Sequence, residues 1–459
     1  MLFEGSLRKM AKALVDFRDG RHGITSHRRD FSNFLKKDLG SMKEESFRGL
    51  KRIIDHAYRT SPYYREVWDR IGFKPSDLRC SEEIGNIPLL TKEIIERNKE
   101  QMISNSFNKE DLEMSYTGGT SGTHTSFHRD VKCTTVRIGR QLGILEFCGY
   151  KLGDRCGLIW GVHEDLPNPE ARPTLKTRFR KFASGKETMC CTIMDSDIMA
   201  NYYTCLKKFK PKVLYGYPNA MSEFATFIRE RKLSPIKVKT IICTAERLSE
   251  AQRALLHETF AGEVFNLYCT REHGCIGFEC KEHSGFHVDI GSVHLELISN
   301  GVPVKPGQTG EIVVTDLLNY GMPFIRNRIG DRGSLSAKAC DCGCNLPLLN
   351  NLDGRVTDLL YRPDGSTVAG VMLVDMFLDT SAIKAMQIIQ ERLDEVNLFL
   401  VVTEAYSKEI EERAIGEITS YMGEGIKINI KRVPEIARNP LSGKYQEVIS
   451  KVRPPRFGE

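Results

Sequence analysis

The stretch TIICTAERLSEAQRALLHETFAGEVFNLY, residues 240–268, decides the fold class of the chain. Its two apolar ends, residues 240–244 and 263–268, have the length and the branched side chains of buried β-strands. Residues 249–260 between them place apolar side chains at helical spacing, which predicts an amphipathic helix. A strand, a helix and a second strand in this order predict a parallel pair of strands joined by a crossover helix.

Short apolar runs continue to alternate with helical segments from about residue 130 to residue 290. This alternation is typical of an α/β protein, in which helices cover a mainly parallel sheet. Upstream, residues 43–72 have helical spacing that is broken at Ser61-Pro62, and Thr91 is predicted to cap a further helix. After residue 285 the pattern becomes rich in strands, with runs at 293–297 and 310–315.

A junction is predicted at residues 353–358. Beyond it lie a strand-like run, 397–403, a helix, 407–422, and a second strand, 427–432. These elements are enough for a small α+β unit. We therefore expect a large α/β domain with a β-rich subdomain (1–352), a hinge (353–358) and a small C-terminal α+β domain (359–459).

The charge balance excludes one class of partner. Lys and Arg number 66 and Asp and Glu number 60, so the formal net charge is +6 over 459 residues. A mild, dispersed excess of this kind favours small anionic ligands over nucleic acid. The densest basic stretch, residues 176–186, is interpreted as a solvated face.

Composition also bears on location. No run approaches the roughly 18 consecutive apolar residues of a membrane span, and the N-terminal residues lack the apolar core of a signal peptide. The 14 cysteines are scattered, and several lie in apolar runs where a reduced thiol behaves as a small hydrophobic side chain. We expect no membrane span, a cytoplasmic location, and thiols or metal ligands in place of disulfides.

Residues 116–125, Tyr-Thr-Gly-Gly-Thr-Ser-Gly-Thr-His-Thr, combine glycines with hydroxyl side chains. Glycines let main-chain N–H groups turn toward a ligand, and hydroxyls add donors, so the loop suits phosphate oxygens. It is not a Walker loop, because no Gly-Lys-Ser/Thr ends it. Taken alone, the composition also fits a flexible surface loop. The residues predicted to contact phosphate are Thr117, Gly118, Gly119, Thr120, Ser121, Gly122 and Thr123.

Four further segments accompany this loop. They are Tyr268-Cys-Thr-Arg-Glu272, the run from Gly310 to Asp331 that contains GEIVVTD and MPFIRNRIGD, Asp353-Gly-Arg355 with Asp358, and Ser442-Gly-Lys444. In this order and spacing they resemble the adenylate-forming enzymes, specifically the phenylacetate–CoA ligase branch and its capsular-polysaccharide relatives. The resemblance spans about residues 45–450. Each motif is weak alone, but five in register are strong.

The resemblance implies that a carboxylate attacks the α-phosphorus of ATP and that pyrophosphate leaves. Positioning and electrostatic stabilisation dominate such chemistry. By this resemblance the Gly/Thr loop would hold the β- and γ-phosphates, and Glu272 would coordinate Mg²⁺. Asp331 would bind both ribose hydroxyls. Lys444 would bridge the acid and the α-phosphate as a mobile point charge.

The resemblance also implies residues around the nucleotide and the acid. Tyr268 and Thr270 are placed at the adenine or ribose, with Ala245 and Glu246 on the opposite wall. Arg355 is expected at a phosphate or at the ribose. Asp358 is the expected rotation point of a mobile C-terminal domain that moves between two half-reactions. The acid pocket is expected to contain Trp160, His163, Tyr215, Tyr217 and Pro218.

Each of these residues also has an ordinary structural explanation. A strand-end carboxylate is commonly solvated, an aspartate after glycine commonly shapes a turn, and a lysine after Ser-Gly is commonly exposed. Aromatic side chains of the pocket set also fit core packing. Two positions depart from the resembled pattern: Cys269 stands where a glycine is common, and His124 stands where lysine or proline is frequent.

A second group of residues predicts a metal site. The loop Cys340-Asp-Cys342-Gly-Cys344 lies some 50 residues beyond Cys280 and His287. Thiolates and imidazole suit tetrahedral Zn²⁺, and some members of the resembled branch carry a structural zinc at matching places. We expect Cys280, His287, Cys340 and Cys342 to hold a structural zinc ion, with Cys344 or His283 as spare neighbours. Reduced buried cysteines without metal are the alternative.

The expected function is that of an ATP-dependent, AMP-forming ligase. It would activate a small carboxylic acid and pass the acyl group to an acceptor, coenzyme A in the phenylacetate–CoA ligase branch. The alternatives are an amide-forming ligase of the capsular-polysaccharide type, whose acceptor is an amine, and a nucleotidyltransferase that adenylates a hydroxyl acceptor. A scaffold without catalysis is disfavoured because Glu272, Asp331 and Lys444 are all present. The oligomeric state stays open, with a homodimer as one alternative.

Overall fold

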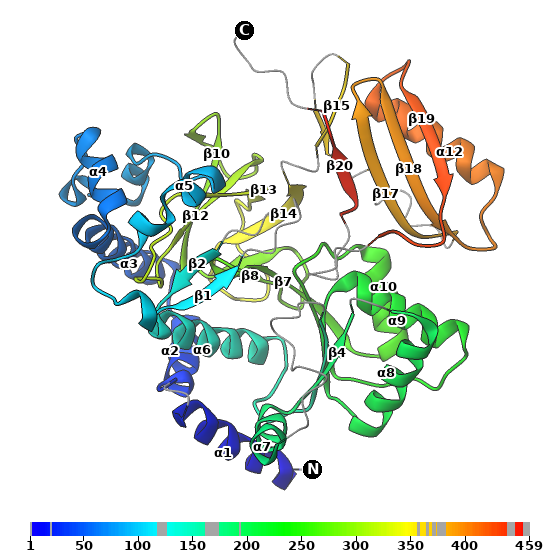
Figure 1. Cartoon of the computed structure of the whole chain (residues 1–459), viewed down its shortest axis with the longest axis horizontal. Helices are drawn as coiled ribbons and strands as arrows, with labels where there is room; N and C mark the ends of the chain where they lie inside the picture. Colours follow the sequence, from blue (N-terminus) through cyan, green and yellow to red (C-terminus); the bar gives the residue numbers. More distant parts are fainter. Residues whose placement is uncertain are drawn as a thin grey trace.

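The computed structural model describes residues 2–18, 21–116, 126–160, 174–191, 194–355, 359–363, 367–369, 373, 382–437 and 446–452. They form a large body built around one mixed sheet and a smaller C-terminal body beside it (Figure 1). Within these residues, no helix has both the length and the hydropathy that crossing a membrane requires.

Helices dominate the N-terminal part of the chain. Asp38 caps α3 by accepting the Ser41 N–H, and Thr91 caps α5 by accepting the Ile94 N–H, as predicted for Thr91. The elements are α1 (Leu2–Arg18), α2 (Ile24–Phe34), α3 (Leu39–Thr60), α4 (Pro62–Arg70), the 3₁₀ helices η1 (Pro75–Asp77), η2 (Ser81–Asn86) and η3 (Lys109–Asp111), α5 (Lys92–Met102), and the hairpin β1 (Glu113–Tyr116) and β2 (Ser126–Arg129).

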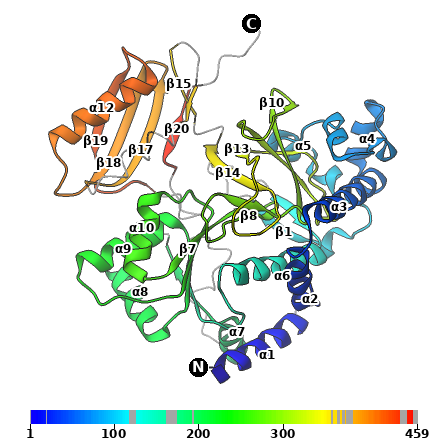
Figure 2. The same cartoon turned by 180° about the vertical axis from the view of Figure 1, so that it is seen from behind.

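Twelve strands form the central sheet, in the order β11-β10-β12-β13-β14-β9-β8-β7-β6-β5-β3-β4. The parallel part alternates with helices, as the sequence predicts: α6 (Val131–Phe147), β3 (Cys156–Trp160), α7 (Leu175–Ser184), β4 (Lys186–Cys190), α8 (Ser196–Phe209), β5 (Val213–Gly216), α9 (Pro218–Glu230), β6 (Thr240–Thr244), α10 (Glu250–Phe260) and β7 (Glu263–Thr270). Helices α8, α9 and α10 cover one face of this part (Figures 1 and 2). Large apolar side chains such as Phe224 and Phe260 fill the layer between them and the strands.

The sheet changes character at β7. This strand pairs in parallel with β6 on one side and antiparallel with β8 on the other. Every strand pair beyond it is antiparallel. The antiparallel part comprises β8 (Gly274–Phe278), β9 (Phe286–Val288), β10 (Val293–Ser299), β11 (Val302–Pro303), β12 (Gly310–Asp316), β13 (Asn327–Leu335) and β14 (Leu348–Arg355).

The C-terminal body has a core of its own. Its four-stranded sheet, in the order β19-β18-β17-β20, packs against α12 through buried residues such as Met386, Leu398 and Ile418. Its elements are the hairpin β15 (Leu359–Tyr361) and β16 (Thr367–Ala369), β17 (Ile383–Arg392), β18 (Glu395–Val402), α12 (Lys408–Met422), β19 (Lys427–Arg432) and β20 (Val448–Ser450). The predicted junction begins inside a strand, because residues 353–355 complete β14. Asp358 lies outside the described residues, so its role as a hinge stays a prediction.

Two glycines allow α2 and α6 to approach closely. A Cβ atom on Gly139 would lie 2.5 Å from the His27 Cβ and 2.8 Å from the Ile24 carbonyl oxygen. A Cβ atom on Gly143, one turn later, would lie 2.5 Å from the Phe31 ring. The absence of side chains at both positions therefore sets the distance between the two helices.

We expect Gly139→Ala to destabilise the protein by about 1–3 kcal/mol, because the new methyl group must push α2 away from α6. Gly416→Ala is the matched control. Gly416 also lies inside a helix but has no neighbour within 4 Å of its added Cβ, so alanine should stabilise that helix by about 0.5–1 kcal/mol. Urea unfolding measures both changes. Equal effects of the two substitutions would contradict the packing argument.

Candidate active site and metal centre

The parallel strands of the large sheet end at one edge. β3, β5, β6 and β7 run in the same direction, so their carboxyl ends lie along that edge. In open α/β sheets, ligands bind outside the carboxyl ends of the strands. The predicted residues at or directly after these ends are Trp160, Tyr215, Tyr217, Pro218, Ala245, Glu246, Tyr268, Thr270 and Glu272. The fold thus gathers residues that lie more than 100 positions apart in the sequence.

Asp331 joins this group from the antiparallel part of the sheet. The Tyr268 hydroxyl, near the end of β7, donates a hydrogen bond of 2.6 Å to the Asp331 Oδ2. Asp331 lies in β13 and pairs with Arg355 of β14 in the strand ladder. The structure therefore brings Tyr268 and Asp331 into direct contact and places the Arg355 backbone beside them. The side chain of Arg355 lies outside the described set.

The turn after β6 has a strained backbone. Ala245 adopts a φ of 69°, the left-handed region that side chains other than Gly and Asn rarely occupy. Glu246 follows, and its carboxylate accepts the Asn219 N–H at 3.3 Å, in the first turn of α9. A carboxylate at a helix N-terminus satisfies a main-chain donor and interacts favourably with the helix dipole. Glu246 therefore stabilises the start of α9 as well as lying at the predicted nucleotide wall.

The aromatic residues predicted for the acid pocket form one cluster. The Trp160 ring centroid lies 4.6 Å from that of Tyr217 and 5.9 Å from that of Tyr215. Tyr217 is 1% exposed and Pro218 is also buried, so these two are part of the core behind the strand ends. The Gln141 amide donates to the Tyr215 hydroxyl at 3.2 Å. Burial raises the pKa of Tyr215 well above its usual value, so this hydroxyl stays protonated.

The turn that carries Glu272, between β7 and β8, is held by buried polar groups. The Arg137 guanidinium of α6 donates to the Glu272 carbonyl oxygen at 2.6 Å and pairs with the fully buried Asp316. The Asn327 amide lies 3.0 Å from the His273 Nε2. Burial lowers the pKa of His273 to about 3, so its ring is neutral near pH 7 and Nε2 can accept this bond.

Sequence reasoning missed Arg137, His273 and Asn327, because a lone basic or polar residue in an apolar segment has no local signature. Arg137 has two further buried nitrogens, Nε and Nη1, that lack a hydrogen-bond partner in the described part of the chain.

Some predicted site residues lie outside the described residues. They are the Gly/Thr loop from Thr117 to Thr125, His163, Asp358 and Lys444. Their predicted roles remain predictions.

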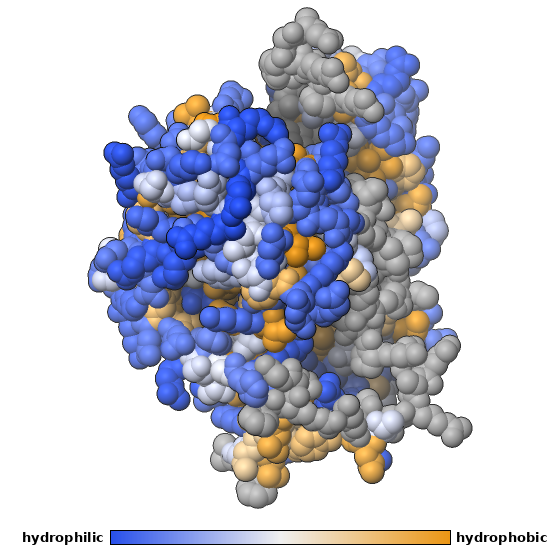
Figure 3. Space-filling model, turned by 60° about the vertical axis from the view of Figure 1, so that its left-hand side comes forward, coloured by the Kyte–Doolittle hydropathy of each residue, from blue (hydrophilic) through white to orange (hydrophobic). Residues whose placement is uncertain are grey.

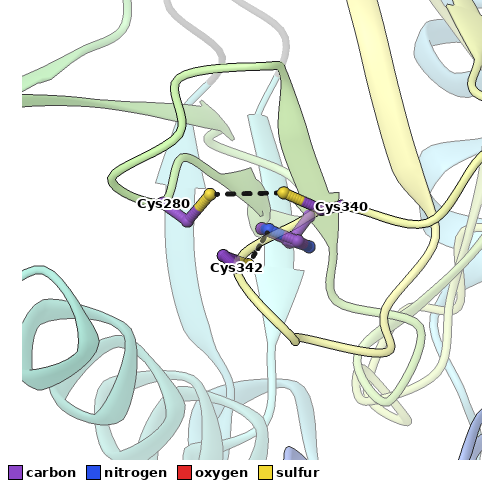
Figure 4. Close-up of side chains that lie close together, drawn as sticks. Cys280, Cys340 and Cys342 are labelled. Atoms are coloured by element: carbon purple, nitrogen blue, oxygen red, sulfur yellow. Dashed lines mark hydrogen bonds between the residues drawn. The ribbon is translucent and has the colours of Figure 1, made fainter.

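The four predicted metal ligands converge on one point (Figure 4). Cys280 follows β8, His287 lies in β9, and Cys340 and Cys342 come from the loop before β14. The Cys280 and Cys340 sulfurs are 3.6 Å apart, the Cys342 sulfur is 3.3 Å from the His287 Nε2, and all four atoms lie within 4.8 Å of one another. Two sulfurs bound tetrahedrally to zinc at about 2.3 Å are separated by about 3.8 Å. The donor set therefore fits zinc in both chemistry and size.

The two spare neighbours take other roles. Both ring nitrogens of His283 face carboxylates, Nδ1 at 3.3 Å from Glu279 and Nε2 at 3.1 Å from Glu263. The Cys344 side chain packs in the apolar layer with Phe31 and Phe278, while its N–H donates to the Cys342 sulfur at 3.4 Å. An N–H bond to that sulfur favours the thiolate form that binds a metal.

The chain is similar to known proteins along most of its length. Residues 360–451 match the family described as the CapK C-terminal domain. The chain is 23% identical over 404 residues to a phenylacetate-coenzyme A ligase of Thermus thermophilus, covering 83% of this chain and 85% of the relative. It is 21% identical over 375 residues to a phenylacetate-coenzyme A ligase of Pseudomonas putida, covering 79% of each.

The fold is also similar to that of a solved structure. A 2-hydroxyisobutyryl-CoA ligase in the postadenylation state, in complex with R3-HIB-AMP, superposes with a TM-score of 0.74 at 18% identity, over 90% of both chains. The predicted fold, a large α/β body followed by a small α+β body, is confirmed.

We expect Arg137→Met to cost about 3–5 kcal/mol of stability, because it leaves Asp316 as a buried charge without its partner. The double variant Arg137→Met/Asp316→Asn should recover part of the loss. Arg328→Met is the matched control, since Arg328 pairs with Glu311 at 43% exposure and such exposed pairs contribute about 0–1 kcal/mol. Chemical denaturation measures all three. A cost for Arg137→Met no larger than that of the control would refute the structural role of the ion pair.

Proposed function

We propose that this chain is an adenylate-forming ligase related to the phenylacetate–CoA ligases. In this proposal it activates a carboxylic acid with ATP and passes the acyl group to coenzyme A. The first half-reaction joins the acid to AMP and releases pyrophosphate. The second replaces AMP with the thiol. The observation that carries the proposal is the Tyr268–Asp331 hydrogen bond at the carboxyl edge of the parallel strands, since it unites two predicted nucleotide residues from distant segments.

In this proposal Asp331 binds the ribose. A carboxylate has two oxygens and roughly four lone-pair sites, so it can accept both ribose hydroxyls and keep the bond from Tyr268. Tyr268 thereby holds the carboxylate in one orientation. Ala245 and Glu246, at the end of the neighbouring strand β6, form the other side of the nucleotide site.

The phosphate end of the site is assigned to the Gly/Thr loop and Glu272. Glu272 would hold Mg²⁺, which supplies positive charge to the phosphate oxygens when bound. Arg137 and the His273–Asn327 pair fix the turn on which Glu272 lies. A rigid turn keeps the carboxylate in place, and such preorganisation lowers the cost of stabilising charge in the transition state.

Lys444 is proposed to bridge the incoming carboxylate and the α-phosphate. It belongs to the C-terminal region, so adenylation requires that region to approach the edge of the sheet. Movement of the C-terminal region away from the sheet edge in the second half-reaction would withdraw Lys444 and open access for the acceptor. The aromatic cluster of Trp160 and Tyr215 would contact the acid, and flat rings favour an aryl group by offset stacking.

A second candidate is an amide-forming ligase of the capsular-polysaccharide type. The CapK match covers the C-terminal region alone, which is the part proposed to control access of the acceptor. An amine would then replace coenzyme A in the second half-reaction. The adenylation chemistry and its residues are unchanged.

The test is ATP–pyrophosphate exchange over a panel of aryl, amino, fatty and sugar acids. We expect one class of acid to support exchange, and Lys444→Ala to lower it by about 10²–10³-fold, the loss typical for one group that stabilises developing charge. Binding of ATP to this variant should be retained. Asp331→Ala should instead weaken ATP binding. Exchange that is unaffected by Lys444→Ala would remove the lysine from the mechanism.

The acceptor is identified with the active acid. Mass spectrometry of the product distinguishes a thioester, formed with coenzyme A, from an amide, formed with an amine. Covalent AMP on a hydroxyl acceptor, with no free AMP, would instead indicate a nucleotidyltransferase and would overturn the ligase proposal.

We also propose that Cys280, His287, Cys340 and Cys342 hold a structural zinc ion. Four protein ligands fill the tetrahedral positions and leave none for a reactive water. The centre would therefore stabilise the loop before β14 without taking part in catalysis.

Purified protein should contain about one zinc ion per chain by elemental analysis. Cys340→Ser should lose the metal and melt at a lower temperature. Cys344→Ser should keep the metal, because that side chain packs away from the cluster, and Cys205→Ser is the control at an exposed cysteine. Folded protein without metal, or loss of metal in Cys344→Ser equal to that in Cys340→Ser, would contradict the assignment.

A further inference from the structure

Helices α1 and α7 lie side by side at one end of the molecule (Figure 1). Arg8 of α1 is buried between them: its guanidinium carbon lies 5.6 Å from the centre of the Phe182 ring. Its Nη1 donates to the Gly153 carbonyl oxygen at 3.2 Å, just before β3 begins. The pair of helices is therefore fixed to the amino ends of the parallel strands, the edge opposite the candidate active site.

Both helices turn their apolar stripes outward. On α1, Leu7, Met10 and Leu14 are spaced as i, i+3 and i+7, and their exposed fractions are 42%, 67% and 64%. On α7, Leu175, Phe179 and Phe182 are spaced as i, i+4 and i+7, with 84%, 46% and 41% exposed. A surface helix usually turns such a stripe toward the core. Of the thirteen large hydrophobic side chains exposed in the described residues, six lie on these two helices.

Figure 3 shows hydrophobic surface gathered at the lower end of the molecule, where α1 and α7 lie in Figure 1. Monomeric proteins rarely leave apolar side chains grouped in this way unless the surface contacts a partner. The sequence predicts a solvated basic face for residues 176–186 but not this exposed apolar surface, because the apolar stripe of α7 could equally have faced inward.

The same helices are strongly basic. Together they contain eight Lys or Arg residues and two acidic residues, a net charge of +6 that equals the net charge of the whole chain. The four basic residues of α7 have no acidic residue among them. Lys9, Arg178, Arg180 and Lys181 are exposed beside the apolar stripes.

We propose that α1 and α7 form a docking surface for an anionic lipid bilayer. The outward apolar stripes enter the interface, and the flanking Lys and Arg side chains meet the lipid phosphates, the arrangement typical of interfacial amphipathic helices. The protein lies on the membrane by this surface and does not cross it. This inference does not depend on the proposed ligase activity.

Two observations favour a lipid surface over a second copy of the chain. In a two-fold dimer this surface would face itself and bring two basic patches together, an arrangement that costs energy. The area is also small. Two packed helices of this length present roughly 20 Å by 15–25 Å, about 300–500 Å², whereas a stable interface buries about 800 Å² per partner.

Docking by this surface leaves the catalytic edge accessible. The C-terminal body lies toward the opposite end of the molecule (Figures 1 and 2). The carboxyl ends of β3, β5, β6 and β7 face away from the strand edge that Arg8 contacts. Substrates that are soluble or that diffuse from the membrane could reach the site while the protein is docked.

Flotation of the full-length protein with phosphatidylcholine vesicles, with and without phosphatidylglycerol, tests the proposal. We expect binding only to the anionic vesicles, and loss of binding when ionic strength rises from about 0.1 M to 1 M, which shortens the Debye length from about 10 Å to 3 Å. Met10→Ser/Leu14→Ser and Leu175→Ser/Phe179→Ser should each lower the partition coefficient about tenfold or more. Lys9→Gln/Arg178→Gln should do the same.

The controls change equally exposed residues elsewhere. Val302→Ser/Leu393→Ser removes exposed apolar side chains, and Lys305→Gln/Lys338→Gln removes exposed charges; both should bind as the wild type does. Circular dichroism checks the folding of every variant. Absence of binding to anionic vesicles, or equal binding by stripe and control variants, would overturn the proposal. A wild-type dimer that the stripe variants convert to monomers would show that a second copy covers this surface.

Discussion

The pairing of β7 on both of its edges is the constraint on which the candidate site depends. Its parallel partner β6 belongs to the alternating strands and helices, and its antiparallel partner β8 begins the β-rich part. A strand that ended the parallel sheet would leave its main-chain donors and acceptors unpaired at an exposed edge. Because β8 returns directly along β7, the short turn between them carries Glu272 at the carboxyl edge. β13 stands three places beyond β8 in the sheet order, and its Asp331 accepts the hydrogen bond of Tyr268.

The buried ion pair of Arg137 and Asp316 stabilises the Glu272 turn, although burying the two charges costs their hydration. Arg137 and Asp316 are both withdrawn from water, and such a pair is favourable only when its remaining hydrogen-bonding capacity is used. Arg137 uses part of it on the Glu272 carbonyl oxygen. The pair thus joins three segments, α6, the turn after β7 and the end of β12, that an apolar contact would join without fixing their orientation. We take this directional role as the reason that a charged pair stands where hydrophobic packing would also be stable.

Much of the fold could be predicted from the sequence because its signals are local. The strand 240–244 and the helix that ends at Phe260 appear as predicted, since apolar spacing is a property of neighbouring residues. The predicted junction, 353–358, overlaps the end of β14, where Arg355 pairs with Asp331 of β13, more than 20 positions away. Pairing of this kind has no local signature. The outward direction of the α1 and α7 stripes was hidden for a similar reason: spacing shows that a helix has an apolar face but not what the face meets.

The candidate active site and the metal centre lie at the two ends of one short strand. β8 begins two residues after Glu272 and ends two residues before Cys280. At about 3.4 Å per residue, these two positions are separated by roughly 25 Å. His287 lies in β9, which pairs with both β8 and β14, so a metal bound there would tie the far ends of these strands together. A short strand fixed at its far end cannot slide along β7, and a slip by one residue would turn every β8 side chain to the other face. A metal centre without catalytic ligand positions can therefore still serve the catalytic edge, by holding the register of the strand that leads into the Glu272 turn.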